Sequence, residues 1–186
     1  MFSPDKTQRN SYIDLNKIYF WTATIHKWYN LLDKNENKQT LIDSLRFLSD
    51  KGCITVYAFV IMPNHIHLIW QANKLNGKES PIGSFLKFTG HQLLEQLKTE
   101  RKELLYVVEK MNKVHEIWQR DPLATEIISL SVARQKMDYI HFNPVSGKWK
   151  LSKDDISYYY SSSTFYETGI DNFGFLNDLV SVFTGN

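Results

Sequence analysis

Apolar residues gather in three short runs in the first half of the chain, as they do in β-strands. Ile18–Thr24 is rich in aromatic and β-branched residues, and two further apolar runs follow at Ile54–Met62 and His65–Gln71. Pro63 and Asn64 separate the last two runs and are typical of a tight turn. The pattern therefore predicts one strand followed, after a gap, by a β-hairpin.

Three other segments show the period of an amphipathic helix. The first covers about 39–49, and the second covers Pro81 to about Thr99, with the proline suited to a first helical position. The third covers about Ala124 to Phe142. It ends before Pro144, because the residue before a proline is disfavoured in helical geometry.

Two segments in the second half of the chain are less distinct. Leu104–Val108 fits either a strand or an irregular linker, whereas Glu116–Gln119 fits a short strand. The tail after Trp149 is aromatic and Ser-rich, without a clear period. The order strand, helix, strand, strand, helix predicts an α+β fold, with an antiparallel sheet covered by helices on one side.

No repeat or low-complexity linker divides the chain. We therefore expect one domain over residues 1–186, with a core of about 15–150 and a C-terminal extension at 151–186. The single cysteine, Cys53, excludes an internal disulfide framework and fits a reducing compartment. No signal peptide and no apolar run of transmembrane length is present, so we expect a cytoplasmic protein without a membrane partner. The net charge of +2 means that any nucleic-acid binding must come from local patches.

His65 and His67 are the first candidates for chemistry. Residues two apart in a strand project to the same face, so both imidazoles would point one way while Ile66 points into the core. That geometry suits two ligands of one metal ion. In an arbitrary pair of this kind, both histidines more often have a structural role, with their hydrogen bonds satisfied within the fold. A metal site therefore needs support from elsewhere in the chain.

Tyr139 and Asn143 supply that support. They are four residues apart and therefore lie on one face of the third predicted helix. A tyrosine hydroxyl beside an amide oxygen can serve as a nucleophile and a third metal ligand. Taken alone, a tyrosine and an asparagine before a proline would be unremarkable.

Two blocks of the sequence together resemble a known family. The runs Val60–Ile69 and Tyr139–Val145 are similar to the two signature blocks of the single-tyrosine HUH transposases of insertion-sequence type, and closest to the REP-associated tyrosine transposases. Weaker similarity at Trp118-Gln119 and at 160–163 extends the resemblance over most of residues 15 to 165. The resemblance implies a ferredoxin-like antiparallel sheet, with the HUH motif on a central strand and the catalytic tyrosine on a C-terminal helix.

The resemblance also implies a reaction. Tyr139 would attack a DNA phosphodiester, giving a 5′-phosphotyrosine link and a free 3′-hydroxyl, while His65 and His67 would bind Mg²⁺ or Mn²⁺. Asn143 stands where insertion-sequence members carry glutamine, and it would be the third ligand. The partner would be single-stranded or hairpin DNA, handled by a monomer or a homodimer on the nucleoid. The protein would thus be a metal-dependent single-stranded DNA endonuclease and strand transferase.

Other residues fit lesser roles. His141 lies two positions from Tyr139 and faces elsewhere on the helix, so it is structural or contacts DNA. The run Tyr158–Tyr160 has no amide or carboxylate at helical spacing and fits packing or base stacking. Four residues of the basic central region and the tyrosine helix are candidate DNA contacts: Lys87, Trp118, Arg120 and Lys136.

Two alternatives remain open. The first is a sequence-specific DNA-binding or regulatory protein that keeps the fold but has lost useful turnover. The second is a zinc-dependent hydrolase that uses His65 and His67, which is disfavoured because no third His, Asp or Glu stands at ligand spacing.

Overall fold

The computed structural model describes residues 13–110, 113–120 and 122–185. Four strands form the main sheet, and two short strands form a separate hairpin. The main sheet contains β1 (Ile18–Thr24), β2 (Ile54–Met62), β3 (His65–Ala72) and β6 (Leu123–Glu126), and the hairpin contains β4 (Val107–Lys110) and β5 (Lys113–His115). The α-helices are α1 (Asn35–Asp50), α2 (Pro81–Thr99), α3 (Leu130–Phe142), α4 (Ser163–Thr168) and α5 (Leu179–Thr184). Three short 3-10 helices lie at His26–Trp28, Leu31–Asp33 and Glu103–Tyr106.

The main sheet is antiparallel, with strand order β2-β3-β1-β6. The chain reaches these positions through β1-α1-β2-β3-α2-β6, which is the ferredoxin-like connection. In the pairing of β1 with β3, Thr22 lies opposite His67 and Trp21 lies opposite Leu68. The α+β class and the antiparallel sheet predicted from the sequence are confirmed.

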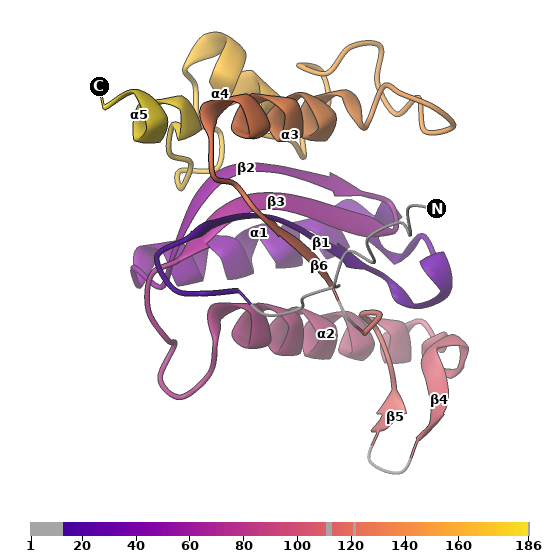
Figure 1. Cartoon of the computed structure of the whole chain (residues 1–186). Coiled ribbons are helices and arrows are strands. Elements are labelled where there is room, and N and C mark those ends of the chain that lie inside the picture. Colours follow the sequence, from indigo (N-terminus) through magenta and orange to yellow (C-terminus); the bar gives the residue numbers. More distant parts are fainter. Residues whose placement is uncertain (1–12, 111–112, 121, 186) are drawn as a thin grey trace, which may run out of the picture.

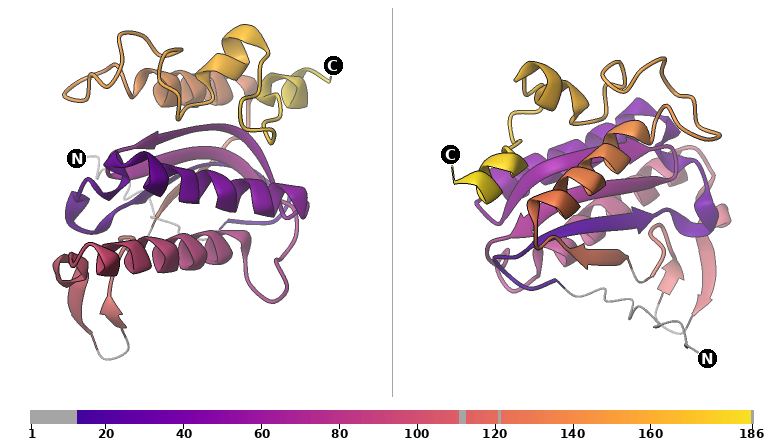
Figure 2. Two further views of the ribbon diagram at one scale, coloured as in Figure 1. Left: turned by 180° about the vertical axis from the view of Figure 1, so that it is seen from behind. Right: turned by 45° about the horizontal axis from the view of Figure 1, so that its top comes forward.

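Helices cover both faces of the sheet. Figure 1 shows α3 on one side of the strands and α2 on the other, and Figure 2 shows α1 beside α2 and α3 lying across the strands. On the α2 face, Trp21 and Trp70 pack against Phe85 of that helix. On the α3 face, Phe20 and His67 contact Tyr139. The expectation that helices would cover one side only is wrong, because α3 and the chain after it close the second face.

Local signals explain the bounds of the elements that the sequence predicted well. The N-cap residue of α2 is Ser80, whose side chain accepts a hydrogen bond from the Gly83 amide, and Pro81 takes the first helical position. The β2–β3 hairpin turns at Pro63 and Asn64, and its register is continuous from the Met62–His65 pair to the Ala58–Ile69 pair, beyond which it shifts between Ala58 and Val56. In the described part of the chain, no helix combines the length and the apolar character needed to cross a membrane.

The helix predicted over Ala124–Phe142 is two elements. Its first residues form β6, in which Thr125 pairs with Phe20 of β1, and α3 begins only after Ser129. The Ser129 hydroxyl accepts a hydrogen bond from the Val132 amide at 3.3 Å and so caps the helix. The prediction was wrong because a short edge strand depends on a distant partner, which no local period records. The tyrosine helix is also not the last one, since α4 and α5 follow it.

Three smaller differences concern element bounds. α1 begins at Asn35, four residues earlier than expected. In its first turn Asn35 and Glu36 are exposed, whereas Asn37 is buried and donates its side-chain amide to the Leu31 carbonyl. The segment expected as a strand at Glu116–Gln119 makes only an isolated bridge between Trp118 and Ile25. The undecided segment Leu104–Val108 is mostly a 3-10 turn that leads into β4.

The C-terminal extension packs along the free edge of β2. Backbone hydrogen bonds join Ile61 to Tyr160, and Ser162 to Phe59. The Tyr158 hydroxyl donates to the Ile61 carbonyl at 2.7 Å. This segment therefore covers an edge that would otherwise expose unpaired backbone groups.

Candidate active site

The two histidines of β3 lie on the α3 face of the sheet. His65 and His67 alternate with Ile66, which faces the other way into the core, and their ring centroids are 4.7 Å apart. Both side chains are buried. The strand geometry expected from the sequence is thus present, and it brings two imidazoles to one point.

The His67 ring is oriented by β1. Its Nδ1 lies 2.7 Å from the Thr22 hydroxyl, while its Nε2 is buried without a hydrogen-bond partner. When Nδ1 carries the proton and donates it to Thr22, the lone pair of Nε2 is left for another ligand. An unpaired nitrogen of this kind inside a protein is the feature expected of a metal ligand.

The His65 ring is oriented by the turn before it. Asn64 donates its amide nitrogen to the Trp28 carbonyl at 3.2 Å, so its Oδ1 faces the His65 Nδ1 at 2.7 Å. An amide oxygen can only accept, and His65 Nδ1 therefore carries the proton. Nε2 is then the nitrogen of His65 that keeps a lone pair, as proposed for His67.

The surroundings of both rings favour the neutral imidazole. Burial, and after it the charge of Lys148, lowers the pKa of His65 to about 4. Burial also holds the pKa of His67 well below its usual value, and the nearby His65 and Lys136 act in the same direction. At neutral pH both rings therefore present lone pairs rather than positive charges.

Tyr139 projects from α3 onto this pair. Its ring centroid is 5.1 Å from that of His67 and 5.9 Å from that of Phe20, both edge-on, and the side chain is 52% exposed. Lys136, three residues earlier on the same helix face, holds its Nζ 4.8 Å from the Phe20 ring centroid. A tyrosine hydroxyl, a cation and two neutral imidazoles thus meet within one chain.

These side chains open into a pocket of about 510 Å³ that we call the tyrosine pocket. Its walls come from β1, β3, α3 and the segment before β6. The lining residues are Phe20, Thr22, Thr24, Trp28, His67, Gln119, Arg120, Pro122, Leu123, Lys136 and Tyr139. Among these described residues, the charged side chains are the cations Arg120 and Lys136, which suit an anionic ligand.

Asn143 forms the C-terminal cap of α3 and is buried. It lies one turn after Tyr139, as predicted, but no contact described for the chain joins its amide to either histidine. Its ligand role therefore stays a prediction. Within residues 13–110, 113–120 and 122–185, no group of three or more His, Cys, Asp and Glu side chains could hold a metal ion, so a metal here would need an amide or water ligands beside the two imidazoles.

The four candidate DNA contacts fall in different surroundings. Lys136 and Arg120 line the tyrosine pocket. Lys87 is exposed on α2 and pairs with Glu79. Trp118 is buried, and its indole Nε1 donates to the Thr89 hydroxyl at 3.0 Å. Lys136 and Arg120 are therefore the two best placed beside Tyr139.

The remaining candidates are mainly structural. His141 is buried, with Nε2 2.9 Å from the Ser162 hydroxyl, and burial lowers its pKa to about 4. Tyr158 and Tyr160 are buried, whereas Tyr159 is exposed. These positions fit a structural role for His141. They fit a packing role for Tyr158 and Tyr160.

Sequence reasoning missed the residues that orient the histidines. Thr22 and Asn64 each hold one Nδ1, and Phe20 stacks on His67 at a centroid distance of 5.4 Å. The spacing of Thr22 and Thr24 around Ala23 is a visible signal that one face of β1 carries polar groups. The opposition of Thr22 to His67 was not visible, because it depends on the strand register.

A search with models of known protein families finds no match to the chain, and a search of curated proteins finds none either. Among solved structures, the chain is similar to a REP-associated tyrosine transposase that was solved bound to a REP hairpin. The TM-score is 0.61 at 18% sequence identity, over 93% of each chain. A second similar structure, a candidate transposase of Deinococcus radiodurans, has a TM-score of 0.44 at 15% identity, over 70% of this chain and 92% of that one. The chain therefore has the fold of a REP-associated tyrosine transposase, as its two sequence blocks implied.

Proposed function

We propose that the chain is a metal-dependent single-stranded DNA endonuclease and strand transferase of the transposase type, with Tyr139 as its nucleophile. The observation that carries this proposal is the contact between the Tyr139 and His67 rings, beside a buried Nε2 that has no partner. The cations Arg120 and Lys136 on the described walls of the pocket support an anionic substrate. The fold similarity supports DNA as that substrate.

The reaction is an exchange of phosphate esters. The Tyr139 oxygen attacks the scissile phosphorus, the bond from phosphorus to the 3′-oxygen breaks, and DNA remains joined to the tyrosine through its 5′-phosphate. The phenolic proton leaves to solvent, and the released 3′-oxygen takes up a proton to become a hydroxyl. Attack by another 3′-hydroxyl reverses these steps, so rejoining requires no nucleotide triphosphate.

His65 and His67 would hold a divalent cation through their Nε2 atoms, with Asn143 as the proposed third ligand. When bound, Mg²⁺ or Mn²⁺ would polarise the scissile phosphate, which matters because a phenol with a pKa of about 10 is a weak nucleophile. The two imidazoles are neutral, so the charge of the ion would remain available to the phosphate. Lys136 adds a positive charge over the Phe20 ring.

The proposal includes attack within one chain. The Tyr139 ring already lies against His67 of the same chain, so no second copy is needed to complete the pair. A monomer is then sufficient for cleavage. The similar structure contains a REP hairpin, which supports hairpin DNA as the substrate. Such a protein would work in the cytoplasm, on the nucleoid.

The test is covalent capture of DNA. The full chain is incubated with Mn²⁺ and a labelled library of DNA hairpins that carry random single-stranded flanks, and the products are separated under denaturing conditions. We expect a protein–DNA adduct that is lost in Tyr139→Phe and in samples treated with a chelator.

Each other outcome points to one of the alternatives. Tight hairpin binding without any adduct would indicate a DNA-binding regulator with this fold. Metal-dependent hydrolysis that persists in Tyr139→Phe would indicate a hydrolase built on His65 and His67.

A further inference from the structure

His141 is a buried polar residue of α3 that the proposed reaction does not use. It follows Tyr139 by two positions and does not line the tyrosine pocket. Its Nε2 is hydrogen-bonded to the Ser162 hydroxyl at 2.9 Å, and its ring lies 5.4 Å from the Tyr166 ring, centroid to centroid. Figure 1 shows α4, which begins directly after Ser162, beside α3. The tyrosine helix is thus joined to the C-terminal extension by a buried hydrogen bond.

Ser162 is in turn fixed to the edge strand β2. Its backbone amide donates to the Phe59 carbonyl at 2.9 Å, and the Phe59 amide donates to the Ser162 Oγ at 3.0 Å. Ser162 is fully buried, so leaving any of these groups without a partner would be costly. One serine hydroxyl therefore contacts both the sheet and the tyrosine helix.

This attachment lies beside the row of the sheet that contains His67. Val60 pairs with His67 across β2 and β3, and on its other side it forms a bridge with Ser161. Residues paired in this way lie about 5 Å apart. From the adjacent Ser162, the contacts continue through α3 to Tyr139, whose ring centroid is 5.1 Å from that of His67. The proposed nucleophile and the proposed metal ligand are therefore joined by a closed ring of contacts.

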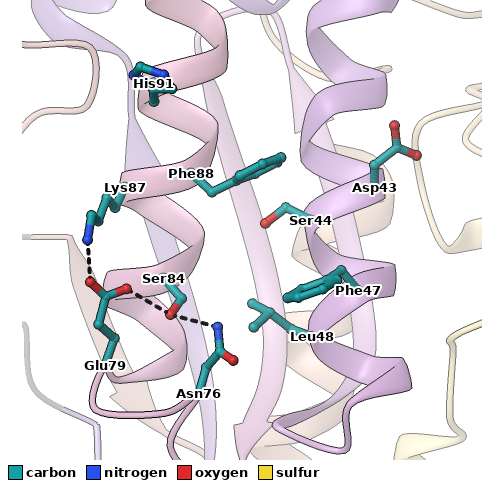
Figure 3. A pocket seen from close by; sticks show the side chains of 10 residues that line it. All are labelled: Asp43, Ser44, Phe47, Leu48, Asn76, Glu79, Ser84, Lys87, Phe88 and His91. Carbon is teal, nitrogen blue, oxygen red and sulfur yellow. Dashed lines mark hydrogen bonds and ion pairs between the residues drawn. The ribbon is translucent and has the colours of Figure 1, made fainter.

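Polar contacts on the other face of the sheet join different parts of the chain. In the hollow between α1 and α2, Figure 3 shows Glu79 bonded to Ser84 and paired with Lys87. Asn76 also donates to Ser84 there. These contacts connect α2 to the loop before it, whereas Phe85 holds α2 on the sheet by apolar packing. A hydrogen bond restricts distance and angle more narrowly than such packing does.

We infer that the hydrogen bond between His141 and Ser162 sets the position of the tyrosine helix over the histidine pair. The two residues are then positioning residues for Tyr139. The inference rests on the proposed function, because a nucleophile needs a defined distance to the atom that it attacks. A displacement of about 1 Å can cost about a hundredfold in rate. The C-terminal extension would thus be a working part of the active site as well as a cover for β2.

Substitutions on both sides of the contact test it. His141→Leu fills a similar volume without a polar group, whereas His141→Gln keeps an amide that can reach Ser162. Leucine and glutamine are both good helix formers, so α3 should persist in either variant. Ser162→Ala breaks the same contact from the other side, and it carries the test if His141→Leu does not fold. Leu97→Ala is the stability control, because it opens a cavity in the buried side of α2 and leaves the contact intact.

The position of Tyr139 is measured in the chain without DNA. 3-Fluorotyrosine replaces Tyr139, and its fluorine NMR signal reports the contacts of the ring with Phe20 and His67. We expect a displaced signal in the two variants that break the contact, and a native signal in the glutamine variant and in the α2 control. The double variant should show no larger displacement than His141→Leu, because both changes remove one interaction. A label at Tyr29, whose ring contacts Tyr106, should stay unchanged throughout.

Adduct formation with the hairpin library and Mn²⁺ gives a second measurement. His141→Leu should lower the maximal rate about a hundredfold and leave the apparent affinity for DNA within about twofold, since His141 does not line the tyrosine pocket. His141→Gln should stay within about threefold of the native rate. A native rate in a variant with a displaced signal would overturn the positioning role.

The fluorine signals separate this inference from the proposed function. Native signals in both His141→Leu and Ser162→Ala would overturn the inference, even if the native chain forms a covalent adduct. A displaced signal in His141→Gln or in Leu97→Ala would also overturn it, because the effect would not follow the hydrogen bond. Displacement only in the variants that break the contact would support the inference, even if no adduct forms and the transferase proposal fails.

Discussion

The two faces of the main sheet differ in chemistry although the same strands build both. On the α2 face, Trp21 and Trp70 pack together and are fully buried. On the α3 face, Thr22 and its register partner His67 hydrogen-bond to each other below the half-exposed Tyr139. One face is therefore a closed core, and the other is a floor for a pocket.

Both faces contain buried nitrogens without hydrogen-bond partners, and the comparison shows which of these matter. On the closed face they are the indole Nε1 atoms of Trp21 and Trp70, and on the open face the nitrogen is His67 Nε2. An indole nitrogen only donates a hydrogen bond, whereas a neutral imidazole also has a lone pair that can bind a metal. An unpaired buried nitrogen therefore indicates a ligand site only where its chemistry permits coordination.

The largest functional effect should come from removing one oxygen atom on the open face. Tyr139→Phe keeps the ring that contacts Phe20 and His67, so the free energy of unfolding should change by less than about 1 kcal/mol. Adduct formation should fall more than about a thousandfold, because no other group supplies the nucleophile. Tyr159→Phe, also an exposed tyrosine, is the control and should keep full activity. An adduct that survives in Tyr139→Phe would assign the nucleophile elsewhere.

A large change on the closed face should act on stability instead. Trp70→Ala removes a fully buried ring that packs against Trp21 and Phe85, and it should lower the free energy of unfolding by about 3–5 kcal/mol. Chemical denaturation measures this loss. Activity per folded molecule should change little, since Trp70 faces away from the pocket. A selective loss of activity at unchanged stability would contradict the separation of the two faces.

The sequence predicted the closed face well because its signals are local. The bounds of β1, β2 and α2 match the predictions from apolar runs, the Pro63-Asn64 turn and the proline at the start of α2. β6 was missed because a four-residue edge strand is specified by its pairing with β1, and that pairing joins residues about a hundred positions apart.

On the open face, the candidate residues were predicted but the residues that orient them were not. His65, His67 and Tyr139 were singled out by their spacing together with the resemblance of two sequence blocks, and the structure brings the three rings together. Their roles in a reaction stay predictions. Thr22 and Asn64 could not be assigned, because their roles depend on strand register and on the orientation of a side-chain amide. Local sequence thus indicated which side chains gather on the open face, while tertiary contacts determine how they are oriented.

Lowering the pH should reduce the free energy of unfolding through the buried histidines of the open face, rather than through the closed face. Because the pKa of His65 is lowered from 6.5 to about 4 in the folded chain, the unfolded chain takes up the proton first as the pH falls. The contribution of the His65 pKa shift to the free energy of unfolding is therefore fully present above about pH 6.5, declines between about pH 6.5 and 4, and is lost below that range. The shift corresponds to about 3 kcal/mol for this residue.

Denaturation in metal-free buffer at several pH values tests this expectation, with His65→Gln as the comparison. The variant should lose about 3 kcal/mol less than the native chain over the same range. His67 and His141, whose pKa values are also lowered by burial, should account for the acid sensitivity that remains. Identical pH profiles for the native chain and His65→Gln would show that the His65 proton is not linked to folding.

The smallest effect should come from the support of His67. Thr22→Val keeps the β-branched shape in β1 but removes the hydroxyl that lies 2.7 Å from His67 Nδ1. The ring should then lose its preferred orientation and tautomer, and the affinity for Mn²⁺ should fall by about tenfold. Titration of adduct formation with Mn²⁺ measures this change, and excess metal should restore the maximal rate because Tyr139 is intact.

Thr22→Ser separates orientation from simple packing, because serine keeps the hydroxyl while losing the methyl group. Thr22→Ser should retain near-native Mn²⁺ affinity. If the Thr22 side chain acted only by packing the strand, both Thr22→Ser and Thr22→Val would weaken Mn²⁺ binding. If Thr22→Val instead titrates like the native chain, the Thr22 contact is a packing feature of the sheet. His67 would then depend for its orientation on its stacking with Phe20.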